Sequence, residues 1–185
     1  MALKEILTEP NKLLRAKSLA VEKVGEDLQK LMNDMLETMY AAPGIGLAAI
    51  QVGVPKRVIV LDIGWRNKLE SANDEKQVVR KNPMCFVNPE IITKSTNNSA
   101  YEEGCLSLPG QFAEIERPDK CHVKYLDYYG QPKEIKAEGM LATCIQHEMD
   151  HLEGILFIDY LSKLKKSMII KKLSKNKKEI ERIVV

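Results

Sequence analysis

The sequence predicts an α+β fold in which mostly antiparallel sheets surround a central helix, with further helices towards the N- and C-terminal ends. Strand-like segments cluster between two helical regions and do not alternate with helices as βαβ units would. A length of 185 residues, with 44% hydrophobic and 29% charged residues, is typical of one globular domain that needs no disulfide support. We therefore expect a single domain over residues 1–160, followed by a basic helix over 161–185 that packs on it or extends from it.

Helical periodicity first appears between about Glu26 and Tyr40 and stops at Pro43–Gly44. The apolar residues that recur there at helical spacing are Leu28, Leu31, Met32, Met35 and Met39. A short β-branched run then follows at 57–64, and such a run predicts a buried strand.

The middle of the chain predicts further strands. The polar, aperiodic stretch 67–82 is expected to be an exposed excursion. Residues 85–96 predict either one strand or two strands broken at Pro89. Alternating residues around a Tyr-Gly-Gln turn predict a hairpin over 120–139. Helical patterns return at 140–151.

The charge of the chain is unevenly distributed. The net charge is +2, but the segment from Leu161 onwards holds nine basic residues against Glu179 and Glu181. This balance of +7 leaves −5 for residues 1–160. The basic segment also has helical periodicity as far as about Arg182, and such an asymmetry suggests an interaction surface.

Nothing in the sequence predicts a membrane or secreted protein. No apolar run approaches the roughly 18 residues that cross a bilayer. The first ten residues carry Glu5 and Glu9 instead of an apolar signal segment. The four cysteines are then best interpreted as reduced thiols. We expect a cytoplasmic location and neither a membrane nor a DNA partner.

The segment HEMDH (147–151) places two of the three histidines four residues apart. On a helix, positions i and i+4 share one face, so both imidazoles can reach one ion. Glu148 lies about 100° round the helix at ~3.6 residues per turn, which suits a proton carrier better than a ligand. Apolar neighbours predict burial, and buried histidines need partners. A metal site is therefore favoured over a chance match on a surface helix.

A catalytic metal site needs a third protein ligand. The longer pattern H-E-x-x-H-x-x-G-x-x-H fails because Phe157 takes its last position, and no acidic residue downstream is well placed. Cys144 lies about 10.5 Å from His151 along a helix axis at ~1.5 Å per residue, too far to share one ion with it. Spacing does not rank the remaining candidates, which are Cys105 in EEGCLSLPG, Cys85, Cys121 and His122.

The stretch GIGLAAIQVG (44–53) is also unusual. It weakly matches a dinucleotide-binding loop, but a helix precedes it where that fingerprint needs a strand. Gly44 and Gly46 could instead let the backbone approach a ligand closely, and Gln51 would add a side-chain amide donor. A tightly packed turn and strand is the alternative.

Three motifs, G-I-G-L-A-A-x-Q, E-G-C-L-S and Q-H-E-x-D-H, stand intact and in this order. Together they resemble the peptide deformylase family. The similarity extends through ERPDKCHVKYLDYYG and LEGILFIDYLS and covers most of residues 1–165, with 65–85 and the final tail less alike. It implies a deformylase-like catalytic domain over 1–160. The implied reaction removes the formyl group from N-formylmethionine of new polypeptides and releases formate.

The resemblance also implies roles for individual residues. The implied metal ligands are Cys105, His147 and His151, the general base and acid is Glu148, the oxyanion donors are Gln51 and the Leu106 backbone N–H, and Gly46 contacts substrate. Hydroxide on one divalent ion would attack the formyl carbon, and the glutamate would carry the proton to the leaving amine. Ligand softness suggests Zn²⁺, whereas the family commonly works with Fe²⁺.

Methionine specificity needs an apolar pocket, and our candidates for its walls are Ile45, Tyr101, Met140, Thr143 and Cys144. Three charged residues near the motifs either orient the metal ligands or form surface ion pairs: Glu103, Arg117 and Asp150.

The partners implied are N-formylmethionyl nascent peptides and, through the basic tail, the ribosome. A merely solvated tail is the alternative. Two competing functions are a metallopeptidase that cuts internal bonds and a binding module with a structural metal.

Overall fold

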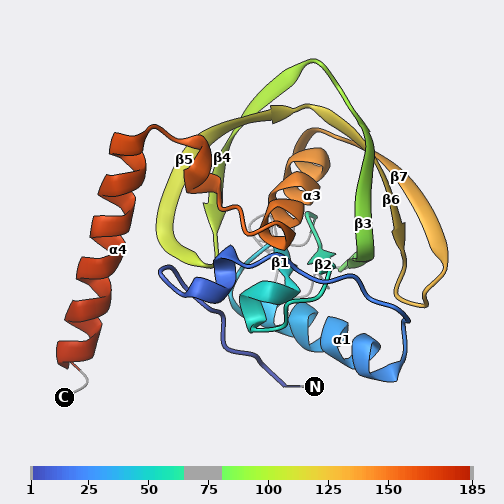
Figure 1. Cartoon of the computed structure of the whole chain (residues 1–185), viewed down its shortest axis with the longest axis horizontal. Helices are drawn as coiled ribbons and strands as arrows, with labels where there is room; N and C mark the ends of the chain where they lie inside the picture. Colours follow the sequence, from blue (N-terminus) through green and yellow to red (C-terminus); the bar gives the residue numbers. More distant parts are fainter. Residues whose placement is uncertain (1, 65–80, 184–185) are drawn as a thin grey trace, which may run out of the picture.

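Two antiparallel sheets enclose the helix α3 (Gly139–Leu152), as Figure 1 shows. The computed structural model describes residues 2–64 and 81–183, with side chains in the last stretch as far as Lys175. The predicted exposed excursion lies outside the described residues, apart from its last two positions. An α+β fold with mostly antiparallel sheets around a central helix is confirmed.

The larger sheet has five strands in the order β1-β2-β3-β6-β7, every neighbouring pair antiparallel. Its strands are β1 (Gly46–Ala48), β2 (Val58–Leu61), β3 (Met84–Lys94), β6 (Lys120–Leu126) and β7 (Pro132–Glu138). The hairpin predicted over 120–139 is β6–β7 and is confirmed. The strand β3 is continuous through Pro89, so a break there is wrong. Its pairing with β6 shifts between Val87 and Glu90, and this irregularity accommodates the proline.

A second, two-stranded sheet consists of β4 (Asn98–Cys105) and β5 (Leu108–Pro118). This hairpin was not predicted, because its residues alternate only weakly between apolar and polar. An isolated two-stranded hairpin has marginal stability, so it depends on packing against its neighbours. Those neighbours include α3 and the short helical turn η3 (Phe157–Tyr160).

The described residues before β3 include a helix and two short turns. Helix α1 (Glu26–Ala41) matches its prediction and buries Met32, Met35 and Met39 against the larger sheet. Acidic residues in its first turn complement the helix dipole. The short turns η1 (Lys12–Arg15) and η2 (Ala49–Val52) lie before and after it.

Helix α4 (Lys163–Ile183) stands at one side of the molecule beside β5 (Figure 1). Leu173 is buried in a cluster with residues of β5 and η3, while Leu164 and Met168 are exposed. The division of the chain at residue 160 into a domain and a tail stays a prediction. Within the described residues, no helix is long and apolar enough to cross a membrane.

Asp159 in η3 joins three segments. Its carboxylate accepts a hydrogen bond from the Leu156 backbone N–H and ion-pairs with Arg15 of η1 and Lys166 of α4. Burial opposes the charge, but the hydrogen bonds from Lys166, the Leu156 N–H and Arg15 hold the pKa of Asp159 below its ordinary value.

We expect Asp159→Asn to lower the free energy of unfolding by about 1–2 kcal/mol at pH 7. A carboxyl whose pKa is lower in the folded state stabilises the fold above its unfolded pKa of about 3.9 and loses this contribution as pH falls through the folded value. The difference from wild type, measured by urea unfolding from pH 7 to pH 3, should therefore shrink with acid. Glu22→Gln, which changes an exposed carboxylate, is the control and should show no such trend.

Candidate metal centre and active site

Three potential ligands converge at the centre of the molecule. The donor atoms of Cys105, His147 and His151 all lie within 4.8 Å of one another. The cysteine Sγ is 3.2 Å from Nε2 of His151. Both histidines are on α3 one turn apart, and the cysteine ends β4, so two distant parts of the chain build the cluster.

Cys105 is held by a β-hairpin. It pairs with Leu108 across a two-residue turn, and the register shifts directly before it. Gly104 leaves room for the Phe112 ring, because a Cβ there would lie 2.5 Å from it. The hairpin tip therefore places the thiol at a defined position above α3.

His147 is oriented by a buried chain of charged groups. Its Nδ1 lies 2.7 Å from Oε2 of Glu103 and donates to it, which leaves Nε2 for a metal. Arg117 on β5 binds both oxygens of Glu103, at 2.5 and 3.0 Å, and donates to Asp150 at 2.7 Å. Because Arg117 is only 3% exposed, surface ion pairing is the wrong interpretation of these charges.

The pKa values of these groups follow from their pairing. Burial opposes the charge of Glu103, but hydrogen bonds from His147 and Arg117 hold its pKa below the ordinary value. Burial likewise disfavours the cationic form of His147, yet hydrogen bonds to Cys105 and Glu103 raise its pKa well above the usual range. Burial and the neighbouring His147 ring lower the pKa of His151.

The residues present fit a divalent metal ion. One thiolate and two imidazoles are a common donor set for a tetrahedral catalytic site with one open position. Both histidines are buried, and Nδ1 of His151 has no hydrogen-bond partner among the described residues. Phe157 stacks on His147 with ring centroids 6.4 Å apart, at the position where the longer motif would need a third histidine.

Glu148 is buried beside the cluster, and its Oε2 has no hydrogen-bond partner within residues 2–64 and 81–183. Burial is the main cause that raises its pKa to about 7. Gly46 in β1 makes room for the carboxylate, because a Cβ there would lie 2.4 Å from Oε1. Glycine at this position therefore accommodates the protein's own glutamate, while contact of Gly46 with substrate stays a prediction.

Gln51 is 2% exposed, and its carboxamide lies against the same cluster. Its Nε2 is 3.0 Å from Oγ of Ser107 and 3.5 Å from Sγ of Cys105. Leu106, in the hairpin turn, packs on Gly44, where a Cβ would lie 2.7 Å from its Cδ1. The structure thus brings both predicted oxyanion residues next to Cys105, and their roles stay predictions.

The proposed pocket residues have differing environments. Ile45 and Tyr101 are half-buried, and Met140 is exposed. Thr143 is buried, and its hydroxyl has no hydrogen-bond partner among the residues that the structure describes. Cys144 is buried, with Sγ 3.8 Å from the carbonyl oxygen of Ile45, and stands outside the metal-ligand cluster, as helix geometry predicts. Their contact with substrate stays a prediction.

Comparisons with known proteins decide the family. The family model described as polypeptide deformylase matches residues 3–167. The chain is 65% identical over 185 residues to a peptide deformylase of Pelagibacter ubique, covering 100% of both chains, and 56% identical over 178 residues to one of Phenylobacterium zucineum, covering 96% and 99%. The chain belongs to the polypeptide deformylase family. Its activity is accordingly the removal of the N-formyl group from nascent peptides.

Solved deformylase structures have the same fold. A peptide deformylase from Ehrlichia chaffeensis superposes with a TM-score of 0.85 at 44% identity, covering 95% of this chain and 97% of that one. The same protein in complex with actinonin gives a TM-score of 0.84. The family membership rules out the two competing functions, an internal peptidase and a non-enzymatic module.

Sequence reasoning on this deformylase missed one residue at the site. Ser107 is fully buried and contacts the Gln51 carboxamide, but a serine in a turn carries no signal of its own. The position of Ser107 directly inside the E-G-C-L-S motif was the only available indication.

We expect Cys105→Ala to abolish stoichiometric metal binding, because two histidines alone leave the site one ligand short. Metal per chain, measured by atomic emission after anaerobic purification, should fall from near one to a small fraction. Cys85→Ala removes another half-buried thiol outside the cluster and is the matched control, which should keep its metal. Equal metal content in both variants would exclude Cys105 as a ligand.

Proposed function

We propose that this deformylase hydrolyses the formamide bond with Glu148 as proton carrier and with Gln51 and the Leu106 backbone N–H as oxyanion donors. The observation that supports this assignment best is the burial of Glu148 and Gln51 directly beside the Cys105 and His147 side chains. The overall reaction adds water across the N–C(O) bond and releases formate and a free amine.

We infer that Cys105, His147 and His151 hold one divalent ion, Fe²⁺ or Zn²⁺. When bound, such an ion supplies Lewis acidity that makes water more acidic and polarises a carbonyl group. The chain's own contribution is the fixed tautomer of His147, since Glu103 accepts its Nδ1–H.

Glu148 has the environment expected of a group that first accepts and later donates a proton. A pKa of about 7 lets the carboxylate take a proton from the attacking water and still release it to the leaving nitrogen. Burial keeps the carboxylate free of competing solvent. Gly46 leaves the space that the carboxylate occupies.

The hairpin turn and η2 carry the two residues proposed as oxyanion donors. Leu106 follows Cys105 directly, so one peptide unit keeps the ligand and the donor N–H in register. Gln51 approaches from η2 with its Nε2 pointing at the same thiol. Each donor to a developing oxyanion contributes about 3 kcal/mol in comparable enzymes.

The test of the reaction compares formyl-Met-Ala-Ser with the unformylated peptide. Formate should appear only with the formylated substrate, and no internal peptide bond should break. Absence of formate from fresh, anaerobically prepared enzyme would contradict the function.

Glu148→Ala should keep its metal and lower kcat by about 10²- to 10⁴-fold, because general acid–base catalysis contributes that much. Metal content and formate release are measured on the same sample. Glu114→Ala, on the outer face of β5, is the exposed control and should turn over normally. A fully active Glu148→Ala variant would refute the proton-carrier role.

We also propose that the chain acts in the cytoplasm and that the basic helix α4 contacts the ribosome, whose emerging chains carry the substrate. Exposed lysines at 171, 172 and 175 support this proposal, because they add positive charge to one described helix. Binding to RNA phosphates through lysines weakens steeply with salt.

Reversing the charge of Lys171, Lys172 and Lys175 to Glu should weaken ribosome co-sedimentation at low salt and flatten its salt dependence. The matched control reverses Lys94, Lys133 and Lys136, three exposed lysines of the larger sheet. Equal loss of co-sedimentation in both variants would show non-specific charge attraction. No loss of co-sedimentation in the α4 variant would exclude α4 as the contact.

A further inference from the structure

The Gln51 carboxamide is fixed at both of its ends. Its Oε1 accepts a hydrogen bond from the Ala48 backbone N–H at 2.8 Å, and its Nε2 donates to Oγ of Ser107 at 3.0 Å. An amide has nearly the same shape when it is rotated by half a turn, so only its partners decide which end faces the site. Here the Ala48 N–H can only donate, so it selects the orientation that presents Oε1 to it, and the Ser107 hydroxyl accepts from the Nε2 at the other end.

Ser107 is itself held rigidly. It is fully buried in the two-residue turn of the β4–β5 hairpin, two residues after Cys105. Its carbonyl oxygen accepts a hydrogen bond from the Glu9 backbone N–H at 2.9 Å. The hydroxyl therefore occupies a defined position next to the proposed oxyanion site.

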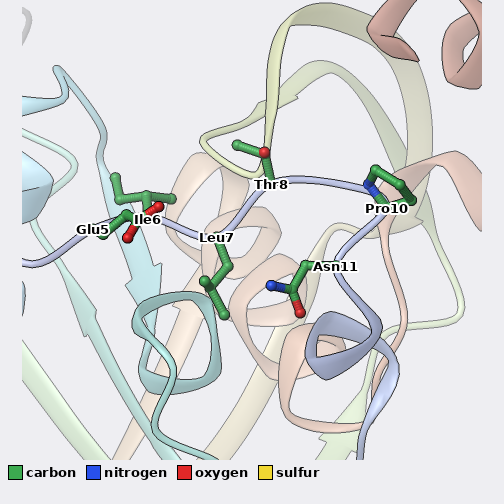
Figure 2. A pocket seen from close by; sticks show the side chains of 6 residues that line it. All are labelled: Glu5, Ile6, Leu7, Thr8, Pro10 and Asn11. Carbon is green, nitrogen blue, oxygen red and sulfur yellow. The ribbon is translucent and has the colours of Figure 1, made fainter. Parts of the chain in front are cut away.

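The N-terminal segment, residues 5–11, makes backbone hydrogen bonds to both Gln51 and Ser107. The Leu7 N–H donates to the Gln51 carbonyl oxygen at 2.7 Å, while the Glu9 N–H donates to Ser107. Figure 2 shows this segment with Leu7 pointing towards the turn η2, and a cavity of about 230 Å³ lies along it. One extended stretch of backbone thus fixes the spacing between the turn that carries Gln51 and the turn that carries Ser107.

We propose that Ser107 is a positioning residue for the deformylase reaction, which acts by aiming the Nε2 of Gln51, and that the N-terminal segment holds the pair in register. The inference rests on the proposed oxyanion role of Gln51. Without the hydroxyl, one N–H of the carboxamide loses its acceptor, and the side chain can swing about its remaining hydrogen bond from the Ala48 N–H. Displacement of a catalytic group by about 1 Å is enough to slow a reaction strongly.

The first experiment compares Ser107→Ala with Ser18→Ala. Ser18 is also buried, and its hydroxyl has no hydrogen-bond partner in the described part of the chain, so the control makes the same chemical change away from Gln51. Ser107→Ala should lower kcat about tenfold with KM changed less than twofold and with metal content unchanged, because only transition-state contact is lost. The control should match wild type. Equal kcat in Ser107→Ala and wild type would overturn the proposal.

A double-mutant cycle tests whether Ser107 affects kcat through Gln51. If Ser107 acts through Gln51, adding Ser107→Ala to Gln51→Ala should change kcat less than twofold. A further tenfold loss in that background would show an independent role and overturn the proposal. If Gln51→Ala alone leaves kcat unchanged, the oxyanion role itself is wrong, and this outcome separates failure of the proposed function from failure of the positioning role.

A readout independent of turnover comes from NMR. The side-chain amide protons of Gln51 should be protected from solvent exchange in wild type and in Ser18→Ala. They should exchange faster in Ser107→Ala, since one of them loses its acceptor. Unchanged protection would overturn the proposal.

The role of the N-terminal segment is tested by two deletions. Removal of residues 2–5 eliminates the anchors of Ala2 on Asp34 and of Lys4 on Thr38 but keeps both backbone bonds at Leu7 and Glu9. Removal of residues 2–9 eliminates those bonds as well and should reproduce the kcat loss of Ser107→Ala. If the longer deletion does not fold, Leu7→Pro removes a single N–H instead. The comparison is with the shorter deletion of residues 2–5. If the deletion of residues 2–9, or Leu7→Pro in its place, has the same kcat as this shorter deletion, the proposed role of the segment is overturned.

Discussion

The buried chain from Arg117 through Glu103 to His147 is the interaction on which the site depends. It joins β5 to β4 and β4 to α3, so it attaches a two-stranded hairpin to the central helix. Such a hairpin would have only marginal stability by itself. Because Cys105 lies at the tip of this hairpin, the chain of charges also sets the position of the third metal ligand relative to the two histidines.

The energetic cost of burying charge explains why each charged group in this chain of side chains is paired. Burial of unpaired charges is costly, and removal of one partner from a buried ion pair typically costs 3–5 kcal/mol. Burial alone would lower the pKa of Arg117, but hydrogen bonds to Glu103 and Asp150 raise it above its already high value, so the cation persists. Tyr160 places its ring 4.8 Å from the guanidinium carbon and donates to Asp150. Every charged member therefore has a partner.

Local sequence patterns predicted the structural features that depend on residues close together in the sequence. The spacing of methionines predicts α1, alternation predicts β6–β7, and helix rise alone separates Cys144 from the metal cluster. Contacts between distant segments were not predictable in this way. The choice of Cys105 over the other thiols depends on packing across 42 or more residues, so only the family motif indicated it. The Ser107–Gln51 contact spans 56 residues, and nothing local indicates it.

The glycines of the motifs show where the sequence argument needed correction. They suggested a backbone that approaches a ligand closely, yet the space that they leave is filled by the protein itself. Gly46 accommodates the Glu148 carboxylate, Gly44 accommodates Leu106, and Gly104 accommodates the Phe112 ring. A methyl group at Gly44 or Gly46 would displace a side chain that lies beside the candidate metal ligands, whereas the exposed Phe112 ring can turn into solvent. Gly44 and Gly46 thus shape the candidate site through the volume that they leave for Leu106 and Glu148.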